Sequence, residues 1–219
     1  MKPIKIIIIS GFLLSIINQT NCYNLPYVNL GDTNILDGGP IRPKPGWYFF
    51  PYTEFYHADR WTGPNGKDLF CTDTPTYNGL VLSFQYAYQR AQYSLLKGHL
   101  GLSIEASLLL YSQVDNNNIG IKNGSTGFGD TDVGVYLQWD TIMRGDRPIF
   151  AHRVQFTVGF PTGDYNASLG VINPGFNIFY IDPYWAATLY FNPKLTASWR
   201  LHYLWCAKNH ATNIKAGDA

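Results

Sequence analysis

Apolar and polar residues alternate with a period of two along most of the chain beyond residue 46. In residues 100–110 the even positions are apolar and the odd positions between them are mostly small or polar. The same two-sided pattern recurs in residues 80–89, 131–139, 150–160 and 195–205, and in weaker form in residues 47–61 and 184–191. Because successive side chains of a strand point to opposite faces, the pattern predicts seven strands with one apolar and one polar face each.

The connections between these predicted strands are long and short in turn. Segments 61–77, 113–129 and 161–181 are long, whereas segments 94–98, 140–147 and 192–194 are short. Outer-membrane barrels have this arrangement, with short periplasmic turns and long external loops. Many of the strands also approach the roughly 9–11 residues that a tilted membrane strand needs. We therefore predict an all-β protein, an antiparallel up-and-down transmembrane β-barrel.

Composition bears on the main alternative, a soluble secreted β-sandwich, whose sheets would alternate in the same way. The polar sides of a soluble sandwich face water and should carry many charges, yet only 14% of the residues are charged. The aromatic content of 16% suits either a packed sandwich or the aromatic girdles of a barrel. A formal net charge of +1 gives no reason to expect a nucleic-acid partner.

The N-terminal residues have the pattern of an export signal. Lys2 and Lys5 precede an apolar run over residues 6–17, after which the chain turns polar. A basic start followed by a short apolar run is typical of a secretory signal peptide, which we assign to residues 1–22. The run is too short for a membrane helix, which needs roughly 20 residues. Cys22 as a lipoprotein acceptor is the less favoured alternative.

Neither a metal site nor an enzyme is expected from the reactive side chains. None of the five histidines has metalloprotease or zinc-finger spacing. His152 is the one histidine in the middle of an apolar face, and the adjacent positions on that face, Phe150 and Val154, offer no nucleophile. We expect no catalysis and no cofactor. Cys71 and Cys206, far apart in sequence, are expected to remain two unpaired thiols.

The polar faces of the strands hold the best functional candidates. In a barrel these faces would line the lumen, where opposite charges pair and either border a permeation route or hold a plug in place. A purely structural pairing that satisfies the interior is an equal alternative. The candidate lumen residues are Glu105, Asp132, Gln138, Arg153, Gln155, Arg200 and His202.

Several motifs together resemble one known family. They are Leu25-Pro26-Tyr27-Val28-Asn29-Leu30-Gly31, Leu36-Asp37-Gly38-Gly39-Pro40, Pro45-Gly46-Trp47-Tyr48-Phe49, Phe128-Gly129-Asp130-Thr131-Asp132, Phe160-Pro161-Thr162-Gly163-Asp164-Tyr165, and the stretch from Asn173-Pro174-Gly175 to Gly217-Asp218. In this order they resemble the outer-membrane transporter family named after the MetA-pathway of phenol degradation.

The resemblance implies a barrel in the bacterial outer membrane that passes small hydrophobic or aromatic molecules inward. The implied partners are outer-membrane lipids, such a solute, and the barrel-assembly machinery. A structural or surface-interaction protein that acts through its long external loops is the alternative of a different class.

The resemblance also implies an incomplete barrel, since family members continue for several strands past the last residues of this chain. Seven strands leave an open edge, and each unpaired backbone group in lipid costs several kcal/mol. Bacterial single-chain barrels accordingly have even strand numbers. We expect a signal peptide (1–22), an irregular plug or periplasmic lead-in (23–45) and a partial, C-terminally truncated barrel (46–219).

Overall fold

The computed structural model describes residues 45–62, 65–68, 74–115, 126–169 and 173–215. The predicted signal peptide, residues 1–22, lies outside this part of the chain. So does the predicted lead-in, residues 23–45, except for Pro45. Within the described residues no helix is long and apolar enough to cross a membrane.

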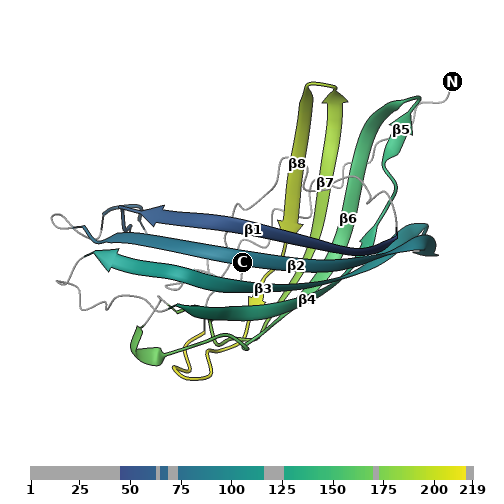
Figure 1. The fold of residues 1–219 in the computed structure, drawn as a ribbon. Helices are drawn as coiled ribbons and strands as arrows, with labels where there is room; N and C mark the ends of the chain where they lie inside the picture. The colour runs from purple at the N-terminus through teal and green to yellow at the C-terminus, as the bar shows by residue number, and fades with distance from the viewer. Residues whose placement is uncertain (1–44, 63–64, 69–73, 116–125, 170–172, 216–219) are drawn as a thin grey trace.

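Seven long strands form one antiparallel sheet in which each pairs with the next along the chain (Figure 1). They are β1 (Gly46–Ala58), β2 (Thr76–Leu95), β3 (Gly98–Asp115), β4 (Gly127–Gln138), β6 (Arg147–Phe160), β7 (Tyr180–Asn192) and β8 (Leu195–His202). Two short strands add to the sheet: β5 (Ile142–Arg144) pairs with β6, and β9 (Trp205–Cys206) pairs with β7. Each of the seven predicted strands has a counterpart in the sheet, although the predicted strand 195–205 is divided between β8 and β9 and β7 begins before residue 184. The described residues form a single sheet, whereas a sandwich needs two.

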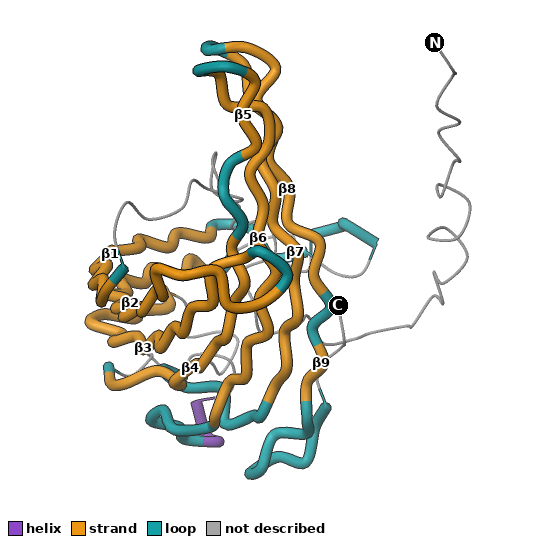
Figure 2. Tube along the Cα trace, turned by 90° about the vertical axis from the view of Figure 1, so that its right-hand side faces the viewer, coloured by secondary structure: helices purple, strands orange, loops and turns teal. Residues whose placement is uncertain are grey.

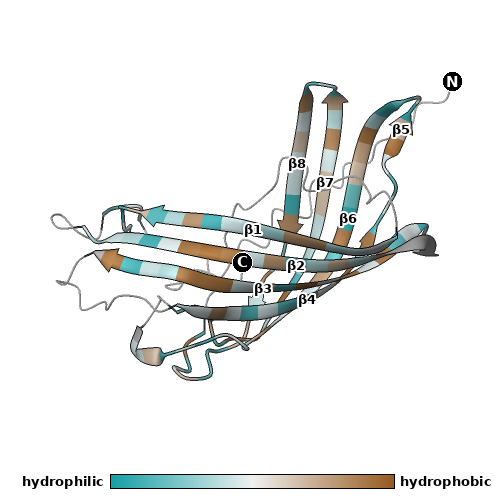
Figure 3. Cartoon of the chain, in the orientation of Figure 1, coloured by the Kyte–Doolittle hydropathy of each residue, from teal (hydrophilic) through white to brown (hydrophobic). Residues whose placement is uncertain are grey.

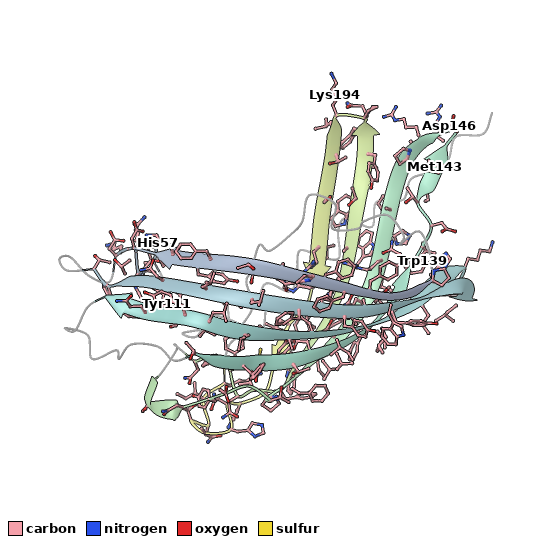
Figure 4. All side chains as sticks on the ribbon, in the orientation of Figure 1. His57, Tyr111, Trp139, Met143, Asp146 and Lys194 are labelled. Carbon is pink, nitrogen blue, oxygen red and sulfur yellow. The ribbon has the colours of Figure 1, made fainter. Side chains whose placement is uncertain are left out.

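Long and short connections lie at opposite ends of the strands, as predicted. In Figure 4, His57 and Tyr111 mark the end with the long connections, and Lys194 and Asp146 mark the end with the short ones. At the short end, β2 and β3 are joined by Leu96 and Lys97 alone, both in the left-handed region at φ 48° and 62°. The strands therefore run up and down between a compact end and an end with large loops.

The sheet is strongly bent, so that β1–β4 cross β6–β8 at a steep angle (Figures 1 and 2). Side chains on one face consequently reach past a neighbouring strand. Tyr52 on β1 donates to Glu105 on β3, and the Tyr136 hydroxyl on β4 donates to the Tyr88 carbonyl on β2 at 3.2 Å. Alternate strands of a flat sheet are roughly 9.5 Å apart, so these contacts identify the concave side. We call this side, with Tyr52, Glu105 and their register partners, the inner face and the opposite side the outer face.

The charged side chains described in the long strands gather on the inner face. Among the side chains described in the seven long strands, the inner face carries Glu54, Glu105, Asp130, Asp132, Arg153, Asp182 and Arg200. One further charged residue, Arg147, lies beside the turn that starts β6. The outer face instead exposes large apolar side chains, such as Phe55 at 66% and Leu201 at 56%. Figure 3 shows hydrophilic and hydrophobic residues interspersed along the ribbons. The predicted two-sided strands are confirmed.

Aromatic rings form a continuous row on the outer face. His152 stacks between Trp139, 4.4 Å away between ring centroids, and Phe150, 5.2 Å away, and Phe150 in turn lies 6.0 Å from Trp199. Ala187 pairs in register with both His152 and Trp199 and is fully buried, since its methyl group leaves room for the rings. An aromatic band of this kind is typical of the surface that a barrel presents to the membrane interface.

The strand predicted over residues 195–205 is wrong as one unbroken strand. β8 ends at His202, where the Tyr203 amide donates to the Pro183 carbonyl at 3.1 Å. Pro183 has no amide hydrogen and cannot return the bond, so the ladder is interrupted there. Pairing with β7 resumes at Trp205. The alternation survives the break, because Tyr203 and Trp205 are exposed while Leu204 and Cys206 are buried.

Cys206 packs with Ile178 and Leu204 in a small apolar cluster, all three fully buried. Cys71 lies outside the described residues. The expectation of two unpaired thiols therefore stays a prediction.

Two inner-face glycines make room for tyrosine rings on the adjoining strand. Gly101 is the register partner of Tyr136, and a Cβ placed on it would lie 1.9 Å from the ring carbon Cζ. Gly159 is likewise paired with Tyr180, whose Cε1 would lie 2.1 Å from such a Cβ. Only glycine allows these rings to lie flat across the neighbouring strand.

We predict that Gly101→Ala destabilises the sheet by about 1–3 kcal/mol, the usual cost of an overpacked site. In a Tyr136→Ala background the ring is gone, and the same glycine substitution should cost much less. Urea unfolding of detergent-refolded protein, followed by tryptophan fluorescence, measures both free energies. An equal cost in the two backgrounds would contradict the proposed packing.

Candidate functional site

The seven side chains proposed from the sequence as lumen residues all lie on the inner face. They occupy β3, β4, β6 and β8: Glu105, Asp132, Gln138, Arg153, Gln155, Arg200 and His202. Register brings some of them together, since Glu105 pairs with Asp132 on the neighbouring strand. Arg153 and Arg200 both pair with Ala186, from its two sides. The acidic and basic members thus form separate groups.

The acidic group is held by tyrosine hydroxyls and an amide. Tyr52 and Gln85 both donate to the Glu105 carboxylate, the latter at 3.5 Å. Tyr180 donates to Asp132. These donors come from β1, β2 and β7, so the carboxylates connect strands across most of the sheet. Hydrogen bonds to a charged acceptor are stronger than neutral ones, and here they brace the concave side.

Tyr184 and Gln155 form the centre of the inner face. The Tyr184 hydroxyl donates to Gln155 Oε1 at 2.6 Å. The Gln155 amide then donates to Thr157 Oγ1 at 3.0 Å and to Ser103 Oγ at 3.4 Å. The last bond passes over Gly134, where a Cβ would lie 2.7 Å from both groups. The position of the Tyr184 ring is thereby set by a chain of hydrogen bonds that extends to β3.

Two arginines face the same ring. The guanidinium carbon of Arg200 lies 4.8 Å from the centroid of Tyr184, and that of Arg153 lies 5.7 Å from it. Both distances are within the range of a cation–π contact, which is about 6 Å. Ala186, between the two arginines in register, is fully buried. The arrangement places two positive charges around one aromatic platform.

His202 belongs to an ion pair beside this platform. Its Nδ1 lies 3.2 Å from Asp182 Oδ1, and both side chains are largely buried. His202 pairs in register with Tyr184. The imidazole therefore links β7 and β8 just before the ladder is interrupted at Pro183.

Gln138 is on the inner face but has a backbone partner. Its amide donates to the His152 carbonyl at 2.9 Å, and the residue is buried. The neighbouring His99 lies 3.2 Å from Asp140 through Nε2. Both groups thus stabilise the start of the β4–β6 connection, which is a structural task at the short-turn end.

Several inner-face residues that contact the candidates were not singled out from the sequence, among them Tyr52, Tyr180, Asp182 and Tyr184. β7 was predicted to begin at residue 184, because Pro183 obscures the pattern. The signal is nevertheless there, since Tyr180, Asp182 and Tyr184 alternate as one polar-aromatic face. This face can be recognised in the sequence only if Pro183 is accepted inside a strand.

The two Gly-Asp motifs organise the long-loop end. Asp130 accepts hydrogen bonds from the backbone amides of Gly163 at 2.8 Å and Phe176 at 2.7 Å. In the opposite direction, Asp164 in the loop accepts a hydrogen bond from the Phe128 amide of β4 at 2.8 Å. Gly163 lies so close to β4 that a Cβ would be 2.6 Å from the Gly129 carbonyl carbon. The motifs therefore tie the loop after β6 to the start of β4.

Asn209 extends this end of the structure. Its side-chain amide donates to the Phe176 carbonyl at 2.8 Å, and its Oδ1 accepts from the amides of Ala211 and Thr212 at 2.9 and 3.0 Å. The residue is buried. The segment after β9 is thus attached to the same loop that Asp130 holds.

An exposed ion pair lies in the connection between β1 and β2. Arg60 Nε is 2.5 Å from Asp68 Oδ1, and this hydrogen bond raises the pKa of the Arg60 guanidinium above its ordinary value. Both side chains are mostly exposed, and such pairs contribute little to stability.

No group of three or more His, Cys, Asp or Glu side chains in the described part of the chain is arranged to hold a metal ion. A shallow hollow of about 400 Å³ lies against β6, β7 and β8. Val154, Trp185, Leu201 and Tyr203 contribute its apolar side chains from the outer face. Gln155, Pro183, Tyr184 and His202 complete its lining.

Comparison with known proteins gives a family and a fold. Residues 64–219 match the model of a family described as the putative MetA-pathway of phenol degradation. Among solved structures, the fold is similar to an outer membrane channel from Pseudomonas putida F1, with a TM-score of 0.64 and 16% sequence identity. The match covers 83% of this chain and 61% of that channel, so the chain spans about three-fifths of the channel's length. No curated protein matches the sequence.

The predicted fold class is confirmed by this likeness. The sheet is that of an antiparallel outer-membrane β-barrel, in which β1 and β8 form the two edges and are not paired with each other among the described residues. In hydrocarbon both edges need partner strands, because lipid satisfies no backbone hydrogen bond.

We predict that Asp130→Ala loosens the loop over residues 161–179 without unfolding the sheet. The substitution removes two hydrogen bonds to a charged acceptor, each contributing about 1.5–3 kcal/mol. Limited proteolysis of detergent-solubilised protein should cut this loop faster than in the wild type. Asp146→Ala, in the exposed turn at the opposite end, is the matched control. Equal protection of the loop in both variants would show that Asp130 does not hold it.

Proposed function

The chain belongs to the family described as the putative MetA-pathway of phenol degradation, and from this premise we propose that it forms the wall of an outer-membrane channel. The proposed solutes are small hydrophobic or aromatic molecules, which would pass along the inner face of the sheet.

The observation that carries the proposal is the confinement of charge to one face. An arginine or lysine on the lipid side of a barrel costs about 2–4 kcal/mol at the bilayer midplane. The described strand residues place seven charged side chains on the inner face and large apolar side chains on the outer face. A sheet built in this way meets lipid with one side and encloses a polar space with the other.

The inner face also suits aromatic solutes. Besides its charges it carries aromatic side chains from three strands: Tyr48, Phe50, Tyr52, Tyr136, Tyr180 and Tyr184. A tyrosine offers a flat apolar ring together with a hydroxyl that donates or accepts hydrogen bonds. A surface of this kind attracts small aromatic molecules weakly and at many places, which is what passage requires.

The comparisons support the same class of function. The family's description refers to phenol degradation, and the solved structure is an outer membrane channel. Passage needs no reacting group, and we assign no catalytic residue. The outer face would contact outer-membrane lipids, and insertion would depend on the barrel-assembly machinery.

We predict that cells lacking general porins take up benzyl alcohol faster when they carry the protein in their outer membrane. Initial uptake rates measured with and without the protein test this. Rates that do not differ, with the protein shown to be in the outer membrane, would contradict a channel for small aromatic molecules.

Two adjacent residues of β6 test which face the solute follows. Thr157 lies on the inner face and Val158 on the outer face, with similar partial burial. After Cys71→Ser and Cys206→Ala, a water-soluble thiol reagent should block most of the benzyl alcohol uptake in a Thr157→Cys variant. The same treatment should leave the uptake of a Val158→Cys variant close to its untreated rate. Equal sensitivity of both variants would rule out passage along the inner face.

A further inference from the structure

We propose that Arg153, Arg200 and Tyr184 form a subsite that binds the carboxylate of small aromatic acids. The inference rests on the proposed function and narrows its solute class, because it assigns one part of the inner face to anions.

The geometry of the two arginines is the first argument. Arg153 on β6 and Arg200 on β8 reach toward Tyr184 on β7 from its two sides, at 5.7 and 4.8 Å from the ring centroid. Their common register partner is Ala186, whose side chain is a single methyl group. The Ala186 position therefore leaves space beside the Tyr184 ring that both guanidiniums face. A carboxylate placed there can accept hydrogen bonds from both guanidiniums.

The platform between the arginines is fixed before any solute arrives. The Tyr184 hydroxyl is bound to Gln155 at 2.6 Å, and Gln155 is bound in turn to Thr157 at 3.0 Å. A ring held at its hydroxyl keeps its faces in place for the cationic groups. Less conformational freedom is then lost on binding, which favours affinity.

The distribution of acidic groups is the second argument. Glu105 pairs in register with Asp132, and Asp132 pairs with Gly159. Gly159 is six residues after Arg153 along β6. At about 3.3 Å per residue this corresponds to roughly 20 Å, about twice the screening length of ~8–10 Å at physiological salt. Their repulsion of an anion at the arginines is therefore weak.

Two acidic groups lie nearer to the arginines along the strands. Asp182 faces His202 at 3.2 Å and interacts electrostatically with Arg200, and Asp140, two residues beyond the register partner of Arg153, faces His99 at 3.2 Å. Because each of these carboxylates faces an imidazole, they do not fully offset the two guanidiniums. The potential between Arg153 and Arg200 is thus positive, and it favours an anion over a neutral solute of the same shape.

The chemistry of the side chains selects a carboxylate on a ring. A guanidinium offers planar, paired N–H donors that match the two oxygens of a carboxylate. The remainder of the inner face carries tyrosine rings, which pack against an aromatic body better than against a hydrated inorganic anion. Benzoate unites both parts in one small molecule.

The test compares two probes of nearly equal size at pH 7, benzoate and the neutral benzyl alcohol. Uptake rates are measured in porin-deficient cells that carry the full chain, its Arg153→Gln/Arg200→Gln variant or the charge-preserving Arg153→Lys/Arg200→Lys variant. Arg60→Gln, in the exposed connection after β1, is the control for loss of an arginine elsewhere. Heat-modifiable migration on a gel confirms that each variant is folded.

We expect the glutamine variant to lower the ratio of benzoate to benzyl alcohol uptake by about tenfold, since each hydrogen bond to a charged group contributes substantially to binding. The lysine variant should retain a larger part of the ratio, and Arg60→Gln should retain it fully. In planar bilayers the reversal potential of the glutamine variant should shift toward cations. If the double variant does not fold, Arg200→Gln alone provides the same two measurements.

The two proposals fail in different ways. If the uptake of neither probe exceeds that of cells lacking the protein, the proposed function is wrong. Uptake of benzyl alcohol with an unchanged ratio and an unchanged reversal potential in the glutamine variant would overturn the subsite and leave the channel standing.

Discussion

Hydrocarbon offers no hydrogen-bond partner and no counter-ion, and the sheet is arranged around that constraint. The charged residues described in its long strands gather on the concave side, where tyrosines, an amide and an imidazole bind several of the carboxylates. Its convex side carries exposed apolar side chains and a row of stacked rings that includes His152. Because an unpaired charge in lipid costs several kcal/mol, this division matters more to the fold than any single contact in it.

Curvature is what makes the inner face a connected surface. Contacts such as Tyr52 with Glu105, or Gln155 with Ser103, join strands that are not neighbours in the sheet. They are possible because the sheet bends and because glycines clear the strand that lies between or beside them. Gly134 lies below the Gln155–Ser103 bond, and Gly101 gives room to the Tyr136 ring. The curvature of the sheet, the glycines and the tyrosine rings therefore depend on one another, and changing one of them alters the packing of the others.

The same concave surface separates its charges. Glu105 and Asp132 are bound by tyrosine hydroxyls, whereas Arg153 and Arg200 share the ring of Tyr184. At the long-loop end, the Asp130 and Asp164 carboxylates are occupied by backbone amides and hold a loop in place. Chemically similar side chains thus have three tasks: bracing strands, presenting charge to the interior and tying down a loop. Their partners distinguish these tasks.

The amino-acid sequence alone determined the strands, their two faces and the order of long and short connections, because a period-two pattern is a local property of the chain. It also placed Glu105, Asp132, Arg153, Gln155, Arg200 and His202 on one side. Only the tertiary structure decided which of them meet. Tyr184 lies between the arginines, Pro183 breaks the ladder and Gln138 binds a backbone carbonyl because of register and curvature. These depend on strands distant in sequence, and no local pattern encodes the distance between two strands once the sheet has bent.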